Sequence, residues 1–384
     1  SYAINCSKPG APVAKAPDPS PWSEITAVRL DVRTDAPAAL ELLERTLAAT
    51  GRIASEYPLI FGADAPGRVV TAREEEQSSE RVLSTCAILS RELVTKQGIV
   101  RAGLIGSVAT DESARGRGLA SQVLERAESE LASQGCLFAL LWADDARFYE
   151  KRGWVAVGTE IDWLLPLERA AELPRSQCTR TAREEDFEAL HALYEQHSER
   201  VLRTLEESRA LYRVPGMQLL VCERDGRVSA YAAHGRGRDL QGVVHEWAGD
   251  AADVLALLRA HLEAQGNDLV LLAPLAPTDV GDRLAALRLA SMHGILGLAK
   301  LLRPDRVGTL IARHAGESGR VREGLGGLLV EGPAQTVRLA PAQVLDLLLG
   351  TRGERRSADE LEAQTGLALP RLPLHPFLFG LDSI

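Results

Sequence analysis

The chain has 384 residues, with 53 aspartates and glutamates against 44 lysines and arginines and a formal net charge of -9. A chain of this length is expected to form two or three domains, each large enough to bury a core of its own. The acidic balance disfavours nucleic acid and anionic membranes as partners, and it favours a cationic small molecule.

Cysteine usage and hydropathy predict a reducing, aqueous compartment. The five cysteines are scattered and lack the paired spacing of a disulfide frame or a zinc site. No apolar run approaches the length of a membrane span. We therefore expect a cytoplasmic protein that binds no metal. Residues 1–25 are rich in proline and lack a signal-peptide pattern, so we expect an extended N-terminal arm.

A glycine-rich loop joins a predicted strand over residues 104–110 to a predicted helix over residues 120–131. Gly116 and Gly118 have no β-carbon, so the backbone can bend sharply and its N–H groups can converge on a ligand at the helix start. That end of a helix is electropositive, and two loop arginines add to the attraction for an anion. The loop therefore predicts a pyrophosphate site, although a tight connection without a ligand has the same pattern.

The spacing of this loop differs from two common nucleotide-binding patterns. It is neither Gly-x-x-x-x-Gly-Lys-Ser/Thr nor a Gly-x-Gly-x-x-Gly followed by a ribose-binding acid. A nucleotide triphosphatase or a dehydrogenase is therefore not expected.

Arg115-Gly-Arg-Gly-Leu-Ala120 matches the pattern Arg/Gln-x-x-Gly-x-Gly/Ala, and Phe148–Trp154 matches the pattern Phe-Tyr-Glu-Lys-x-Gly-Phe/Trp. In this order the two segments closely resemble the GNAT superfamily of acyl-coenzyme A dependent N-acetyltransferases. The resemblance covers roughly residues 26–165 and implies an α/β (α+β) fold, a mixed central sheet flanked by helices, with acetyl-coenzyme A as co-substrate.

The resemblance also implies roles for single residues. The pantetheine arm would pair with the strand at Val108, Ala109 and Thr110. Tyr149 would hydrogen-bond the leaving sulfur, and a phenol is protonated at neutral pH and can donate to a thiolate. A structural hydrogen bond is the alternative role for Tyr149. The pyrophosphate would lie on the main-chain N–H groups of Arg115, Gly116, Arg117, Gly118, Leu119 and Ala120.

An amine acceptor must also be deprotonated before it can attack the thioester. A primary amine with a pKa near 10.4 is almost wholly charged at neutral pH, which adds about 4 to 5 kcal/mol to the barrier. Many GNAT enzymes carry a glutamate on the strand before the phosphate loop, but residues 104–110 contain no acid. The base must therefore come from water or from another part of the chain.

The order of elements repeats over residues 177–290, which we interpret as a second, degenerate GNAT fold. Strands are predicted there over 219–223, 228–233, 243–247 and 269–272, with a hairpin turn at Asp225 and Gly226. Its counterpart of the phosphate loop, residues 248–253, lacks the glycine spacing and the arginines and adds two acids. This copy should not bind coenzyme A. Residues 234–239 also contain glycines and arginines, but a strand follows them, so a hairpin turn is expected there.

Residues 291–384 predict a sheet with helices packed on it, including strands near 326–330 and 336–339 and a helix over 341–349. After two GNAT copies, this order resembles the sterol-carrier-protein-like domain of the enhanced intracellular survival acetyltransferases. That resemblance implies acetylation of cationic amines, on small molecules or lysine side chains, and assembly into homo-oligomers.

The apolar, proline-stiffened C-terminus is expected to dock on the protein. In the enhanced intracellular survival group the terminal carboxylate reaches the active site, so the carboxylate of Ile384 is a candidate base or amine anchor, with Asp382 or Ser383 beside it. A tail that only covers a core or an oligomer contact is the alternative. Glu246 is a second candidate base, and it or His245 could line the acceptor pocket; a buried structural pair is the alternative.

These observations predict an N-acyltransferase in which an amine attacks the thioester directly. Cys136 lies in a predicted buried strand, where its thiol would be inert as a nucleophile. Two alternatives remain, a sensor that binds acyl-coenzyme A without turnover and an interaction scaffold.

Overall fold

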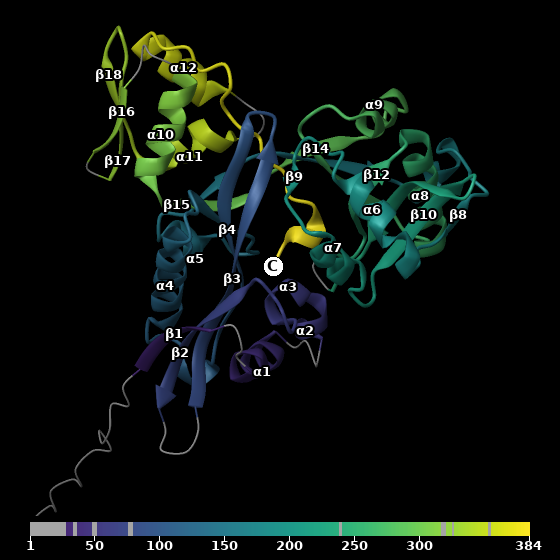
Figure 1. Cartoon of the computed structure of the whole chain (residues 1–384), viewed down its shortest axis with the longest axis horizontal. Coiled ribbons are helices and arrows are strands. Elements are labelled where there is room, and N and C mark those ends of the chain that lie inside the picture. The colour runs from purple at the N-terminus through teal and green to yellow at the C-terminus, as the bar shows by residue number, and fades with distance from the viewer. Residues whose placement is uncertain are drawn as a thin grey trace, which may run out of the picture.

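The computed structural model describes residues 28–33, 37–47, 52–75, 80–237, 240–315, 320–324, 326–351 and 355–384. The expected N-terminal arm, residues 1–25, lies outside these residues. The described chain contains three β-sheets with helices on their faces (Figure 1). It is a mixed α/β fold, as the sequence predicts.

The first sheet has eight strands in the order β1-β2-β3-β4-β5-β15-β6, and β9 pairs with β3 beside this path. Most neighbours are antiparallel, but β4 and β5 run parallel. The strands are β1 (Val28–Arg33), β2 (Arg68–Glu75), β3 (Glu80–Thr95), β4 (Gly98–Thr110), β5 (Phe138–Leu141), β6 (Val155–Val157), β9 (Arg200–Val201) and β15 (Gly297–Leu301).

Helix α4 (Leu119–Ser133) packs on this sheet through a stripe of buried residues at helical spacing: Leu119, Val123, Leu124, Ala127 and Leu131. This is the helix that the sequence predicts after the glycine-rich loop. The short helix α5 (Arg147–Glu150) follows β5, and α1 (Pro37–Thr46), α2 (Ile53–Glu56) and α3 (Pro58–Phe61) precede β2.

The second sheet has seven strands in the order β14-β7-β13-β12-β11-β10-β8. Most of its strands lie where the sequence predicts them, including the hairpin at Asp225 and Gly226, whose positive φ angles of 50° and 74° suit a two-residue turn. The strands are β7 (Glu160–Leu165), β8 (Thr179–Thr181), β10 (Gln218–Arg224), β11 (Arg227–His234), β12 (Val243–Gly249), β13 (Leu269–Pro274) and β14 (Ser291–Gly294). The helices are α6 (Phe187–Tyr194), α7 (Leu205–Tyr212), α8 (Ala251–Gln265) and α9 (Asp279–Ala286).

The two large sheets exchange strands. Strand β7 follows β6 directly in the chain but pairs with β13 and β14 of the second sheet. In return, β15 follows the second sheet in the chain but lies between β5 and β6 of the first. The two sheets are therefore connected through their strands as well as through packing.

The third sheet has three antiparallel strands, β16 (Arg320–Gly324), β17 (Gly327–Glu331) and β18 (Thr336–Leu339). Three helices accompany it, α10 (Pro304–Ala315), α11 (Pro341–Leu349) and α12 (Arg356–Thr365). The expected strands near 326–330 and 336–339 and the helix over 341–349 are present, whereas β16 and α12 were not predicted. The likeness to a sterol-carrier protein stays a prediction.

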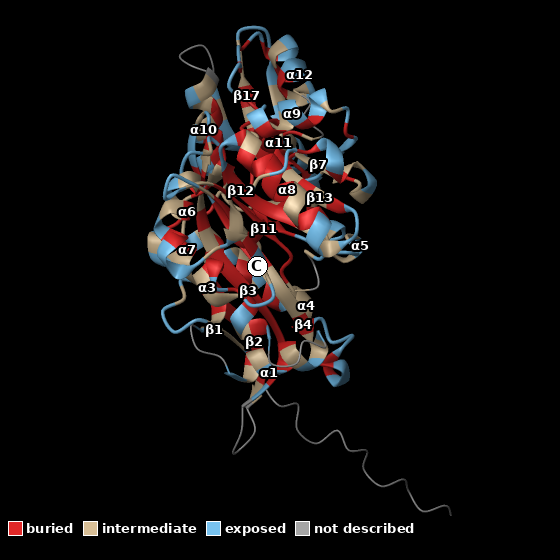
Figure 2. Ribbon diagram, turned by 90° about the vertical axis from the view of Figure 1, so that its right-hand side faces the viewer, coloured by how far each residue is buried: buried red, intermediate tan, exposed pale blue. Residues whose placement is uncertain are grey.

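One apolar core includes residues from all three parts of the chain, for example Leu104, Trp247 and Leu349. Buried residues are concentrated on the central strands (Figure 2). The chain ends in the middle of the molecule, close to β3, α3 and α7 (Figure 1). Within the described residues, no helix has the length and apolar character needed to cross a bilayer.

Candidate functional site

The glycine-rich loop runs from the end of β4 to the start of α4. Gly116 and Gly118 both have a φ angle of 78°, in the left-handed region that favours glycine, and Gly118 forms the N-cap of α4 without a side-chain cap. Within the described part of the chain, no group accepts a hydrogen bond from the N–H groups of residues 116–120. A Cβ on either glycine would meet no atom within 4 Å. The helix start is therefore open, with unused donors that suit an anion.

The two loop arginines differ in their surroundings. Arg115 is exposed, and no described residue forms an ion pair with it. Arg117 pairs with Glu74 of β2, with 3.3 Å between Nη2 and Oε1. Arg115 therefore has its whole charge available to a ligand, whereas the charge of Arg117 is partly compensated.

Strands β4 and β5 separate beside this loop. Their pairing ends at Leu104 and Leu140, although β4 continues to Thr110. The β3–β4 ladder is interrupted by a bulge in the same region, where Ser107 has a φ of 49°. The bulge and the separation leave one edge of β4 without a strand partner. The sequence contains no signal for this bulge, because serine is not a residue that favours positive φ.

The three residues expected to pair with the pantetheine arm lie just beyond the bulge. Val108 packs toward the core under α4, while Ala109 packs on the opposite side with Leu43 and Ile53. The hydroxyl of Thr110 lies 2.9 Å from that of Ser84. Residues 108–110 and the loop residues 115–120 thus follow one another closely in the chain, from the unpaired edge of β4 to the start of α4.

Tyr149 lies on α5 and packs on the same core as Val108. Its ring makes edge contacts with Phe148 and Trp154, at centroid distances of 5.0 and 6.2 Å. Burial raises the pKa of Tyr149, so the phenol is protonated at neutral pH. Tyr149 is therefore a proton donor on the α4 side of the sheet.

The corresponding helix start in the second sheet is closed. The side chain of Asp250 caps α8 and accepts hydrogen bonds from the N–H groups of Ala252 and Asp253, at 2.9 and 3.1 Å. A carboxylate thus occupies the place where a phosphate would lie. Arg236, in the glycine-rich segment expected to be a hairpin turn, lies between β11 and β12 and not at a helix start.

The end of the chain reaches β4 on the face opposite α4. A Cβ on Gly106 would overlap the main-chain carbonyl group of Ile384. Ile384 also lines a small hollow together with Tyr57, Leu211 and Arg236. The C-terminal segment, residues 380–384, therefore contacts β4 at Gly106, which immediately precedes the bulge at Ser107.

Arg236 holds this segment from one side. It is only 5% exposed, and it donates to the carbonyl oxygens of Gly380 and Ser383 at 2.8 and 3.0 Å. Its guanidinium lies 4.5 Å from the ring centre of Tyr57 and donates to the carbonyl of Glu56. The sequence did not point to Arg236, because a lone arginine between two glycines carries no signal for a distant backbone partner.

Arg203 holds the segment from the other side. Its side chain is fully buried and pairs with two buried carboxylates, Asp382 and Glu246, at 2.7 Å in each case. Tyr231 donates to Glu246 at 2.8 Å, and the Tyr194 hydroxyl lies 3.1 Å from Asp382. Burial raises the pKa of Glu246, against the lowering effect of Arg203. The two candidate acids are thus brought together, but on a buried arginine that the sequence did not identify.

His245 is also fully buried. Its Cβ lies where a side chain on Gly380 would point, and its Nε2 is 3.4 Å from the carbonyl oxygen of Gly235. Burial, followed by the charge of Arg236, lowers the pKa of His245 to about 3. It is therefore neutral, and it packs beside the C-terminal segment.

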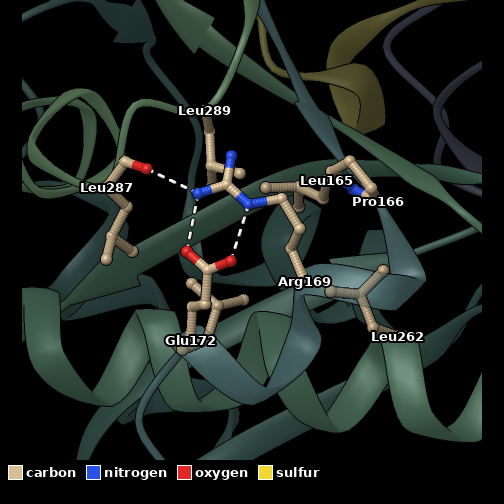
Figure 3. Close-up of a pocket in the computed structure, with 8 residues that line it drawn as sticks. Leu165, Pro166, Arg169, Glu172, Leu262, Leu287 and Leu289 are labelled. Atoms are coloured by element: carbon tan, nitrogen blue, oxygen red, sulfur yellow. Dashed lines mark hydrogen bonds and ion pairs between the residues drawn. The ribbon is translucent and has the colours of Figure 1, made fainter.

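A second, shallow hollow lies where the end of β7, the segment after it, α8 and the segment after α9 meet (Figure 3). Five leucines line most of it, and Arg169 pairs with Glu172 at 2.6 Å and donates to the carbonyl of Leu287. These polar groups already have partners, so the hollow offers no reactive group. Across the described ranges, no group of three or more His, Cys, Asp or Glu side chains could hold a metal ion.

Comparisons with known proteins agree with this geometry. Residues 34–157 match the family model described as an acetyltransferase (GNAT) domain. No curated protein sequence matches the chain.

Several solved structures are similar over nearly the whole chain. An Enterococcus faecalis protein described as "Probable N-Acyltransferase" has a TM-score of 0.63 at 15% identity, covering 94% of this chain and 100% of its own. A GCN5-related N-acetyltransferase from Kribbella flavida has a TM-score of 0.57 at 12% identity, with 93% and 100% covered. Eis1 from Mycobacterium abscessus has a TM-score of 0.54 at 15% identity, with 92% and 100% covered.

Identities this low establish a shared fold and do not establish a shared substrate. The family match is local, and it includes the open loop, the separated strands and α5. Residues 34–157, most of which form the first sheet and its helices, therefore match an acetyltransferase (GNAT) domain.

Proposed function

We propose that this protein is an acyl-coenzyme A dependent N-acyltransferase that transfers an acyl group, expected to be acetyl, directly to an amine. The acceptor would be a small cationic molecule or a lysine side chain. The observation that carries this proposal is the row of unused N–H groups at residues 116–120, which lies beside the free edge of β4.

The first sheet would hold the donor. The N–H groups of residues 116–120, with Arg115, would bind the pyrophosphate, and the edge of β4 at residues 108–110 would pair with the pantetheine amides. The second sheet would bind no coenzyme, because Asp250 already occupies the N–H groups at the start of α8. The donor supplies an activated acyl group as a thioester.

In the transfer step, the amine nitrogen bonds to the thioester carbonyl carbon, the carbon–sulfur bond breaks, and the amine loses a proton. Tyr149 would give its proton to the departing sulfur. The carboxyl group of Ile384 would accept the proton of the amine, because it lies next to the bulge in β4. Cys136 is not a candidate nucleophile, since burial raises the pKa of its thiol.

Two measurements test the proposal. Calorimetry with acetyl-coenzyme A should detect binding, and a thiol-release assay with a panel of amines should detect turnover. Binding with no turnover on any amine would favour a sensor, and no binding would favour a scaffold; either result would overturn the proposed activity. The same assay with longer acyl donors would define the acyl length.

A further inference from the structure

The C-terminal segment is fixed by residues that come from the second sheet and its connections. Arg203 lies between β9 and α7, and Arg236 lies between β11 and β12. Both side chains are nearly or fully buried. The face of the first sheet on which the C-terminal segment lies is thus completed by residues from the second part of the chain. In that part, Asp250 caps the helix start that corresponds to the phosphate loop.

The segment that carries Arg203 is also bound to the first sheet. Strand β9 pairs with β3, with Val201 opposite Leu93. Arg91 of β3 donates to both carboxylate oxygens of Glu207 at 2.6 and 3.1 Å and to the carbonyl of Leu202 at 3.0 Å. The position of Arg203 is therefore set by direct contacts with the sheet that contains the bulge.

From Arg203 the contacts continue to the end of the chain. Its two donors bind both oxygens of Asp382 at 2.7 Å, a bidentate geometry that fixes direction as well as distance. Its guanidinium also lies 4.1 Å from the ring centre of Tyr194. Two residues later, Ile384 meets Gly106. A closed path of contacts thus runs from β3 through Arg203 and Asp382 to β4.

Arg236 acts on the same segment from the side of α2. Its contacts with Gly380 and Ser383 lie on either side of Asp382, and its guanidinium lies against Tyr57, which lines the hollow beside Ile384. The two arginines therefore fix both the backbone and the side chain of the segment.

We propose that Arg203 and Arg236 are positioning residues, which hold residues 380–384 against Gly106 and so set the geometry of the acceptor pocket. In this proposal the second part of the chain positions the C-terminal segment and does not itself bind coenzyme A. It rests on the proposed N-acyltransferase function for its effect on turnover, but the position of the segment can be measured without any activity.

The first experiment measures that position. Purified protein is treated with a carboxypeptidase, and loss of the last residues is followed by mass spectrometry. Arg203→Met and Asp382→Asn should lose them at least 10-fold faster than the unmodified protein. Arg209→Met, on the exposed side of α7, is the matched control and should be trimmed at the unmodified rate. Equal trimming of all four proteins would overturn the proposal.

Arg203→Met could unfold the protein, so circular dichroism is recorded for each variant. Asp382→Asn and Arg236→Lys keep similar volumes; the first weakens the Arg203–Asp382 contact, and the second weakens the contacts of Arg236 with Gly380 and Ser383. If both are folded and trimmed at the unmodified rate, the proposal is wrong.

The second experiment separates positioning from general stability. Arg203→Lys keeps the charge but cannot make the bidentate contact. We expect kcat for the amine to fall at least 10-fold while the affinity for acetyl-coenzyme A, measured by calorimetry, stays within 2-fold. An equal fold-decrease in kcat and in the affinity for acetyl-coenzyme A would indicate a merely structural role and would overturn the proposal. If no variant, the unmodified protein included, turns over any amine, the proposed function fails, and the trimming result still decides the positioning role.

Discussion

The main-chain carbonyl group of Ile384 lies against Gly106, so closely that any side chain at position 106 would displace it. Gly106 belongs to β4, next to the bulge at Ser107, after which we propose that the strand pairs with the coenzyme. This contact joins the end of the chain to the part of the first sheet where the thioester is expected.

Gly106→Ala tests this contact without changing the sequence of the C-terminal segment. We expect kcat to fall about 100-fold, because small displacements of a reacting group have effects of that size. The free energy of unfolding should fall by about 1 to 3 kcal/mol from overpacking. The control is the same substitution in a chain that lacks residues 381–384, where the clash is absent and the cost should be below about 0.5 kcal/mol. Equal costs in the two backgrounds would contradict the contact.

Arg115→Gln should weaken the binding of acetyl-coenzyme A up to about 5-fold, since an exposed charge at a helix start contributes up to roughly 1 kcal/mol. Arg117→Gln should have a smaller effect, because Glu74 already compensates part of its charge. Calorimetry at low and high salt measures the affinity of each variant for acetyl-coenzyme A. The loss of affinity caused by each substitution should be smaller at high salt. Arg126→Gln, farther along α4 and paired with Glu130, is the control. An effect of Arg126→Gln as large as that of Arg115→Gln would argue against the loop as the anion site.

Tyr149→Phe removes the proposed donor to the sulfur while keeping the ring contacts. We expect kcat to fall about 100-fold, within the range of general acid catalysis, with no change in the affinity for acetyl-coenzyme A. Because burial raises the pKa of Tyr149, the unmodified enzyme should keep its protonated phenol up to at least pH 10. Tyr212→Phe is the control: this buried tyrosine ends α7 and packs on Phe187, away from α5. Unchanged turnover in Tyr149→Phe would favour a structural role.

Glu160 and Asp162 project from the same face of β7. Both carboxylates lie beside Gly294 of β14, at 3.1 and 2.9 Å from the position of an added Cβ. Burial and then the neighbouring Asp162 raise the pKa of Glu160 from 4.5 to about 8. The folded protein therefore holds a proton on Glu160 that the unfolded chain releases, so this residue makes stability fall as pH rises between these two values.

Glu160→Gln should remove that dependence. The variant should match the unmodified protein near pH 4.5 and be more stable by about 2 kcal/mol or more at pH 8.5, because glutamine imitates the protonated acid. Urea unfolding at several pH values measures the difference. Glu168→Gln, at an exposed position, should leave the pH profile unchanged. A stability difference that is constant with pH would show that Glu160 titrates normally.

Much of the coenzyme side could be predicted from short segments of sequence. The strand, the two glycines, the arginines and the apolar stripe of α4 lie within one continuous stretch, and each is governed by local geometry. The sequence also predicted that residues 248–253 would not serve as a phosphate loop, since they lack the glycine spacing and the arginines and add two acids. The bulge at Ser107 could not be predicted, because it arises from the pairing of β3 with β4 and not from a turn-forming residue.

The acceptor side was predicted only in part. The apolar C-terminus indicated docking, and Glu246 and Asp382 were selected as acids, but their common partner Arg203 was missed. The contact between Arg203 and Asp382 spans 179 residues of chain. No local pattern encodes it, because it exists only after both sheets have formed.

The sequence by itself determined the glycine-rich loop, the helix behind it and the absence of a matching loop at residues 248–253 of the second sheet, since backbone freedom and charge act over a few residues. Only the tertiary structure decided which strand enters which sheet, and that Ile384 meets Gly106. These arrangements depend on contacts between segments far apart in the chain, where burial of apolar surface and pairing of buried charges act on the folded molecule as a whole.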